Sequence, residues 1–280
     1  MTFRERNVRF ASFALCALTF ALAGGAACAQ QERIDTDNVV SGIPWTAPEA
    51  YRYVIINSKE QPQGEGVFSV TRDAGGNFVM VQQFSDEDGN SDSSTVVVDA
   101  RTLRPLAGER EIIDAAEDRR VTAVRVYGAE DGGDAIVRIA EQTYDPPDED
   151  DPSLRCSPLK IDGEHYYDND ISLFLWRTIT FEEGWSGTYT NVLANRRAQR
   201  ALTVRVRRQE RITTPAGTFD AWLVGIEGEG KETQSAWFAA TPDHKLLVYN
   251  NRENQVFLYA GAADVPDVDA PAALPVKCAG

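Results

Sequence analysis

The residues best suited to chemistry are two histidines, because His165 and His244 are the imidazole bases of this sequence. A hydrolase would need one of them beside a nucleophile and a carboxylate that orients it. The stretch GWSGT at 184–188 misses the G-x-S-x-G pattern of a nucleophile elbow by one place. Glu182 and Glu183 are adjacent, so in a strand they would point to opposite faces. The sequence therefore predicts a protein that is not an enzyme.

Acidic residues could supply a second kind of chemistry, which is metal binding. The polar side chains that alternate from Asp86 to Asp92 have the spacing of the first half of a calcium loop. However, Ser91 stands where that loop needs glycine, and Val97 stands where it needs a bidentate glutamate. The acidic run at 145–151 has no ordered ligand pattern, and no cluster of His and Cys offers a zinc site. We therefore expect no metal and no cofactor.

Any functional residues must be positioned mainly by β-strands, because the hydrophobic pattern has mostly a period of two. Segments such as 78–84 and 121–127 are rich in β-branched and aromatic residues, and hairpin turns separate them. One apolar stretch departs from this period, and we expect the main helix there, around 169–179, with Asn169 or Asp170 as its cap. A buried strand is the alternative for this stretch.

The N-terminal segment has the layout of an export signal. Three arginines precede an uncharged apolar run over 11–23, and small residues follow it. The run is shorter than the about 20 apolar residues that span a bilayer. Cleavage after residue 29 would make 1–29 the signal peptide, whereas lipidation of Cys28 would limit it to 1–27. The sequence predicts a periplasmic or outer-membrane-anchored protein that contacts a membrane only through such an anchor.

The rest of the chain divides into a linker over 30–48, a single β-rich domain over 49–260 and an Ala/Pro/Asp-rich tail over 261–280. Removal of 1–27 takes away three arginines and one glutamate, so the net charge of −15 becomes −17. Such an acidic protein is not drawn to nucleic acid. Two further cysteines can pair in an oxidising compartment and fix the tail to the domain, with free thiols as the alternative. They are Cys156 and Cys278.

One turn is sharply specified by its sequence, TTPAGTF at 213–219. Pro215 presets φ for the first corner of a type I turn, and Gly217 can supply the left-handed position of a three-residue hairpin loop. We interpret this stretch as a turn that fixes strand register, and not as part of a site.

Four stretches carry a family resemblance. They are VVVDARTLRPL (96–106), YDNDISLFLWRTI (167–179), VRRQERITTPAGTFDAWLV (206–224) and AWFAATPDHKLLVY (236–249). In this order they resemble an uncharacterised family of bacterial envelope proteins, domain of unknown function 3108. The resemblance implies a mainly β fold with a strongly curved antiparallel sheet, an open half-barrel similar to the LolA/LolB lipoprotein carriers. It implies no activity.

Aromatic residues offer the remaining route to a function. On the concave face of such a sheet they could line a cavity for an acyl chain, as in the LolA-like carriers. The residues that we expect to do so are Phe174, Trp176, Trp222 and Trp237. The alternative is that they fill the core. The sequence thus predicts a non-enzymatic envelope protein that binds a lipid or a lipoprotein acyl chain, or else a structural or assembly partner of another envelope protein.

Overall fold

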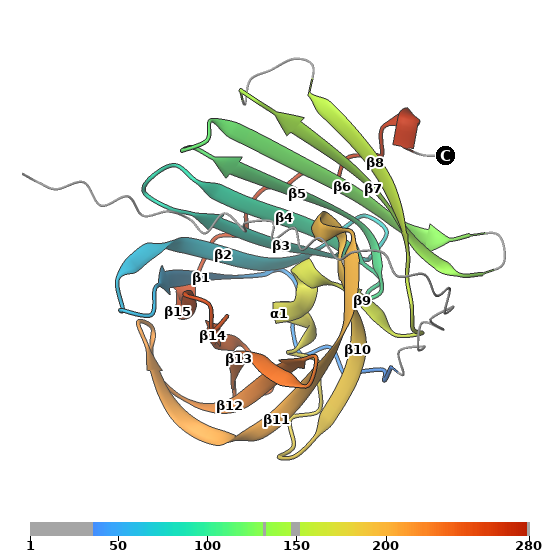
Figure 1. Ribbon diagram of the computed structural model, residues 1–280. Coiled ribbons are helices and arrows are strands. Elements are labelled where there is room, and N and C mark those ends of the chain that lie inside the picture. The colour runs from blue at the N-terminus through green and yellow to red at the C-terminus, as the bar shows by residue number, and fades with distance from the viewer. Residues whose placement is uncertain (1–35, 131–132, 147–151, 279–280) are drawn as a thin grey trace, which may run out of the picture. The chain divides into compact units, whose positions relative to one another are not determined.

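The computed structural model describes residues 36–130, 133–146 and 152–278. The predicted signal peptide and Cys28 lie outside these residues. The described part of the chain forms one 15-stranded sheet (Figure 1). Its strands are β1 (Glu49–Ile56), β2 (Pro62–Arg72), β3 (Phe78–Ser85), β4 (Ser91–Val98), β5 (Pro105–Asp114), β6 (Arg119–Ala129), β7 (Ala135–Tyr144), β8 (Ser153–Lys160), β9 (Tyr166–Asp168), β10 (Ser186–Leu193), β11 (Ala198–Thr214), β12 (Gly217–Gly228), β13 (Lys231–Ala239), β14 (Leu246–Asn250) and β15 (Val256–Ala262). Short helical turns are η1 (Asn169–Ile171), α1 (Ser172–Leu175), η2 (Ala194–Arg196) and η3 (Val276–Cys278).

The sheet is an antiparallel meander that bends back on itself without closing. Strands β1 to β8 follow one another across it, and β15 returns beside β1, so that β10 to β15 extend the sheet on the other side. The two edges are β8 and the short β9, which pairs with β10 in parallel. Figure 1 shows β10 to β15 curling around α1 while β3 to β8 flare away. The predicted fold class, a strongly curved and open antiparallel sheet, is confirmed.

The helix is much shorter than the predicted 169–179. Only Ser172–Leu175 is α-helical, and a 3₁₀ turn precedes it. The cap is neither of the two expected residues but Asp168, whose side chain accepts a hydrogen bond from the backbone N–H of Asp170. After α1, the chain closes tighter turns in which the N–H of Thr178 bonds the carbonyl of Leu175 at 3.0 Å. The carbonyl of Thr178 then accepts from the backbone N–H of Ser41, so it is satisfied by a tertiary contact and not by a further helical turn.

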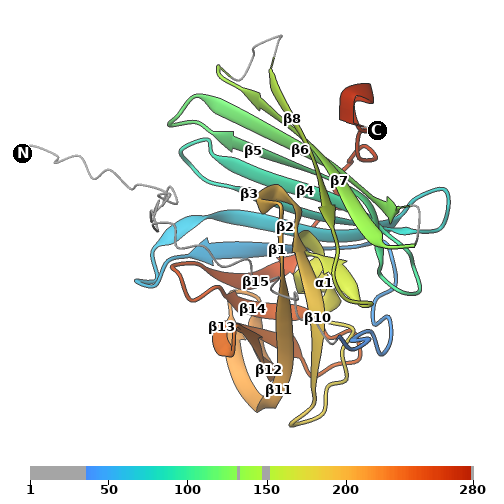
Figure 2. The ribbon, with the colours of Figure 1, turned by 45° about the vertical axis from the view of Figure 1, so that its right-hand side comes forward.

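The main core lies inside the curl, between the concave face of the sheet and α1. Strands that alternate in and out place their apolar side chains there. Figure 2 shows α1 on the inside of the curl, and Phe174 of α1 and the following Trp176 belong to this core. The predicted linker contributes as well. Val39 and Trp45 are buried in this core, and the N–H of Asp37 bonds the carbonyl of Thr188 at 2.6 Å. The core therefore includes part of the segment that precedes the sheet.

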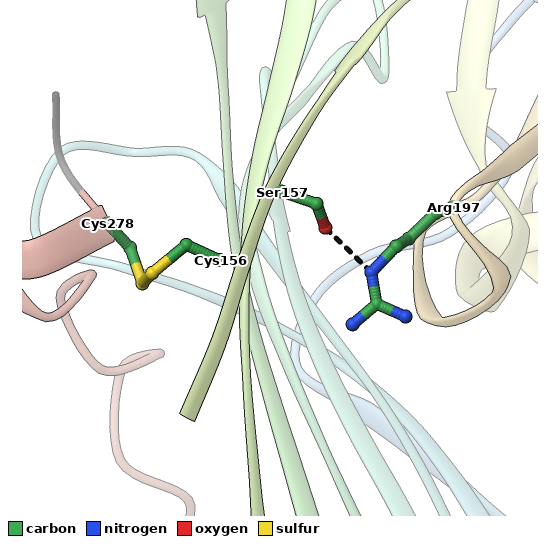
Figure 3. Close-up of a disulfide and its surroundings, with 4 residues drawn as sticks. All are labelled: Cys156, Ser157, Arg197 and Cys278. Atoms are coloured by element: carbon green, nitrogen blue, oxygen red, sulfur yellow. Dashed lines mark hydrogen bonds between the residues drawn. A yellow bond between two sulfur atoms is a disulfide. The ribbon is translucent and has the colours of Figure 1, made fainter. Parts of the chain in front are cut away.

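The C-terminal tail is fastened to the edge of the sheet. Cys156 of β8 and Cys278 of η3 form a disulfide, as predicted, across 122 residues of sequence (Figure 3). Midway along the tail, the N–H of Ala272 donates to Glu109 at 2.9 Å. Figure 3 shows Ser157 on the opposite side of β8 from the disulfide, where it accepts a hydrogen bond from Arg197 at 2.7 Å. Strand β8 is thus held on both of its faces.

Candidate functional site

The four predicted ligand residues do not converge on one cavity. Phe174 and Trp176 lie in the core, and Trp176 donates its indole N–H to the hydroxyl of Tyr189 at 3.0 Å. Trp222 is half-buried. It lies on the concave face, since its cross-strand partner Phe238 is buried there. Trp237 immediately precedes Phe238 in β13, so it points to the opposite face. The acyl-binding role of these residues stays a prediction.

The entry to α1 is anchored by a buried group of charged side chains, which we name the ionic cluster. Arg125 of β6 contacts Asp168 at 2.5 Å and Asp170 at 2.7 Å. The side chains of Arg125 and Asp168 are each 1% exposed, so this pair is shielded from water. Arg110 of the neighbouring strand β5 also contacts Asp170. Tyr127 donates its hydroxyl to Asp168 at 2.6 Å. The full cluster consists of Asp92, Arg110, Arg125, Tyr127, Asp168 and Asp170.

Charge balance within the ionic cluster favours a structural role. Burial would raise the pKa of Asp170, but the guanidinium groups of Arg125 and Arg110 bring it below the usual value. Burial and the neighbouring Asp168 raise the pKa of Tyr127 well above the usual value. Near neutral pH, Asp170 is therefore ionised and Tyr127 is neutral, and neither is poised to exchange a proton.

A second buried arginine holds the loop between β13 and β14. Arg177 forms an ion pair with Glu49, and it donates to the carbonyls of Asp243 at 2.9 Å and His244 at 3.2 Å. Its guanidinium also lies 5.1 Å from the ring of Trp45. These contacts fix the backbone of residues 240–245, which form one wall of a hollow.

The hollow has a volume of about 490 Å³. Most of its lining is apolar. Asp243 and Lys245, 3.4 Å apart, are its charged members, and Thr241 adds a hydroxyl. The lining residues are Pro44, Phe219, Ala239, Thr241, Pro242, Asp243, Lys245 and Leu247. Two of the four stretches that carry the family resemblance line it, through Phe219 and through residues within 239–247. A third supplies Arg177, which holds the loop in its wall.

The hairpin at 214–217 positions Phe219 beside the hollow. The register pairs Thr214 with Gly217, so the loop has two residues and not the predicted three. Gly217 has a φ of 133°, which fits the prediction that this position needs glycine. The N–H of Ala216 bonds the carbonyl of Tyr259 at 3.3 Å, and this contact bends the hairpin toward β15. Sequence reasoning treated the stretch only as a turn and missed its contribution to the hollow.

The histidines occupy unrelated places. The ring of His244 stacks on Phe181 with centroids 4.0 Å apart, and its Nδ1 lies 3.2 Å from the carbonyl oxygen of Ala239. Burial lowers the pKa of His244 below its ordinary value, so the ring is neutral near pH 7. The backbone N–H of His165 donates to Thr36 at 3.0 Å. Glu182 and Glu183 are exposed in the loop before β10.

The calcium-like stretch forms the turn between β3 and β4. The carboxylate of Asp86 accepts from the backbone N–H groups of Asp88 and Asn90, each at 2.9 Å, and so caps its own turn. Among the described residues, no group of three or more His, Cys, Asp or Glu side chains could hold a metal ion. The helices in this part of the chain also lack the length and apolarity of a membrane span.

Comparisons place the chain in a family. No curated protein sequence matches it. Among solved structures, a β-barrel-like protein of domain of unknown function 1849 from Brucella abortus is similar, with a TM-score of 0.39, 10% identity and coverage of 78% of this chain and 98% of that chain. A Bacteroides fragilis protein with a YmcC-like fold has a TM-score of 0.30, 11% identity and coverage of 80% and 100%. The model of the family described as protein of unknown function DUF3108 matches residues 51–255, and the chain therefore belongs to this family.

Proposed function

We propose that this protein is an exported, non-catalytic binding protein of the cell envelope, and that its ligand places an apolar group such as an acyl chain in the hollow. The observation that carries the proposal is the apolar lining of a 490 Å³ space next to a rigidly held loop. Ligand sites are typically about 300–1,000 Å³, with apolar walls and a few polar groups that orient the ligand. Lys245 and Asp243 provide such polar groups.

The interior of the curl is a poorer candidate for the same ligand. Trp176 is 1% exposed, and it extends from Tyr189 toward Tyr249, whose ring centroid is 6.3 Å from its own. Phe174 packs against Phe68 with centroids 6.0 Å apart. These side chains occupy the middle of the concave face, so an acyl chain there would have to displace well-packed core residues. The hollow requires no such rearrangement.

Export is supported by two observations that do not depend on the hollow. The N-terminal segment combines arginines, an apolar run and small residues in the order of a signal peptide. The Cys156–Cys278 disulfide is typical of an oxidising compartment outside the cytoplasm. A mass measurement of the mature N-terminus would test export and would show whether Cys28 carries a lipid.

Ligand binding is tested by native mass spectrometry and lipid extraction of protein purified from its own envelope. Wild-type protein should carry a stoichiometric apolar molecule. Thr241 is exposed and lines the hollow, so Thr241→Trp should fill the space and remove that molecule. Thr213→Trp is the matched control, since Thr213 is exposed but does not line the hollow. Clean apo protein in the wild type, or equal loading of both variants, would contradict the proposal.

A second candidate function is assembly with another envelope protein. Strand β8 is an edge of the sheet, and most of its side chains are exposed. An edge strand presents backbone N–H and C=O groups that can pair with a strand from a partner. The N–H of Leu154 faces the open edge, because the odd-numbered residues of β8 direct theirs toward β7. Recovery of a stoichiometric protein partner from the envelope, whose binding is lost on Leu154→Pro and unchanged by Thr241→Trp, would favour this function over the binding of an apolar ligand.

A further inference from the structure

Arg200 is an inward-facing cation at the start of β11. It pairs across the sheet with Asn191, a residue that is fully buried. Residues at even spacing in a strand share one face, and Leu202 and Val204 of the same strand lie in the main core. Arg200 therefore points into the curl, on the face that also holds α1.

This arginine differs from the other arginines on the concave side. Arg110 and Arg125 contact aspartates of the ionic cluster, and Arg177 contacts Glu49. Among the described residues, by contrast, Arg200 has no ion pair, and its Nε is buried without a hydrogen-bond partner. The side chain of Arg200 is half-buried, and its Nε is a buried donor, whereas buried polar groups normally find partners. The structure thus supplies a donor without an acceptor.

The surroundings of Arg200 add a second donor and an apolar surface. Burial raises the pKa of both Tyr189 and Tyr249, and the nearby charge of Arg200 opposes this rise in each case. The Tyr189 hydroxyl accepts from Trp176, whereas that of Tyr249 has no hydrogen bond within the described residues. The ring of Tyr249 packs on Phe257 with centroids 5.4 Å apart. Tyr249 therefore joins a free hydroxyl to an aromatic surface.

We propose that Arg200 is a binding site for an oxyanion, a carboxylate or a phosphate, with the hydroxyl of Tyr249 as a further donor. A guanidinium group suits this role because its fork of N–H groups matches two oxygens of such an anion. Neither residue lines the hollow, so this site does not depend on the proposed function. The oxyanion can be free phosphate or the head group of an amphiphile.

Titration calorimetry with the purified full chain tests this site. The probes are inorganic phosphate, decyl phosphate, decanoate and neutral decanol. Arg200→Gln should weaken anion binding about tenfold or more, because hydrogen bonds to a charged group contribute on that scale. Arg208→Gln is the control, because it removes the same charge from an exposed residue that pairs with Glu210. This variant should bind the anions as tightly as the wild type does. The affinity for decanol should be the same in the wild type and in both variants.

The pattern across the probes identifies the source of the oxyanion. Binding of inorganic phosphate assigns a free-phosphate site, whereas binding of only decyl phosphate or decanoate assigns an amphiphile head. Should Arg200→Gln fail to fold by circular dichroism, Arg200→Lys keeps the charge without the fork and should bind with intermediate affinity. The proposal is overturned if no anion binds the wild type more tightly than decanol, or if the Arg200 variants bind the anions like the wild type.

Discussion

Substitution of Asp168 by asparagine should destabilise the fold through the ionic cluster. The change keeps the size of the side chain and removes the charge that faces Arg125 at 2.5 Å. Both side chains are 1% exposed, so water cannot replace the lost partner. Removal of one member of a buried pair costs about 3–5 kcal/mol. Because Arg125 keeps Asp170 at 2.7 Å, we expect the lower end, about 3 kcal/mol.

Arg125→Met should cost more, near about 5 kcal/mol, because it leaves two buried carboxylates facing one remaining arginine. For a domain of this size each kcal/mol lowers Tm by about 2–4 °C, so Asp168→Asn should lower Tm by roughly 6–12 °C. The double variant Arg125→Met/Asp168→Asn should be more stable than Arg125→Met alone, since it also removes an uncompensated carboxylate.

Thermal unfolding followed by circular dichroism measures these differences. Lys160→Met is the control, because the Lys160–Asp134 pair is 61% and 60% exposed and its loss should leave Tm unchanged. Two results would show that the ionic cluster does not anchor α1. One is that Asp168→Asn leaves Tm as unchanged as Lys160→Met does. The other is that the Tm changes of Arg125→Met and Asp168→Asn simply add in the double variant.

Three further predictions concern the turn, the disulfide and acid stability. Gly217→Val should cost about 1–3 kcal/mol through backbone strain, measured by urea unfolding, and Gly42→Val, which meets no atom within 4 Å, should cost less. Cys278→Ser should lower stability by about 4 kcal/mol and speed hydrogen exchange in the tail, whereas unchanged exchange would show that the disulfide does not hold it. The folded-state pKa of Asp170 is lowered, so its stabilisation is present above the ordinary aspartate pKa of about 4 and is lost as the pH falls further. The Tm of wild type should therefore fall more steeply in acid than that of Asp170→Asn, and parallel profiles would refute this.

The strand content could be predicted because alternation along a strand is local information. Ala123, Arg125 and Tyr127 illustrate both the strength and the limit of this reading. Their spacing predicts a strand with one inward face, and all three are buried on it. However, the aspartate that pairs with Arg125 lies 43 residues away, and no spacing rule links the two. An arginine at an inward position was the signal that could have indicated a buried partner.

The length of the helix could not be predicted from its apolar stretch. A continuous apolar run shows that a segment is buried but does not fix its conformation. After the helical turns, the carbonyl of Thr178 is satisfied by Ser41, which belongs to the segment that was predicted to be a linker. Burial of Val39 and Trp45 likewise depends on the curl of the sheet, which the sequence implied only through the family resemblance.

The hollow was missed because it is assembled from separate segments. Pro44, Phe219 and Leu247 come from the N-terminal segment, β12 and β14, and none carries a distinctive motif for ligand binding. The tryptophans that seemed better suited to a ligand instead fill the core or lie on opposite faces of the sheet. Large aromatic residues indicate burial more often than binding.

Photocrosslinking tests the location of the apolar ligand most directly. A fatty acid with a diazirine near the end of its chain would be added to the full chain, irradiated, and mapped by peptide mass spectrometry. Adducts are expected at Phe219 and within 239–247, with loss of these adducts in Thr241→Trp and retention in Thr213→Trp. Saturable labelling confined to other segments, or no saturable labelling at all, would contradict the claim that the hollow binds an apolar group.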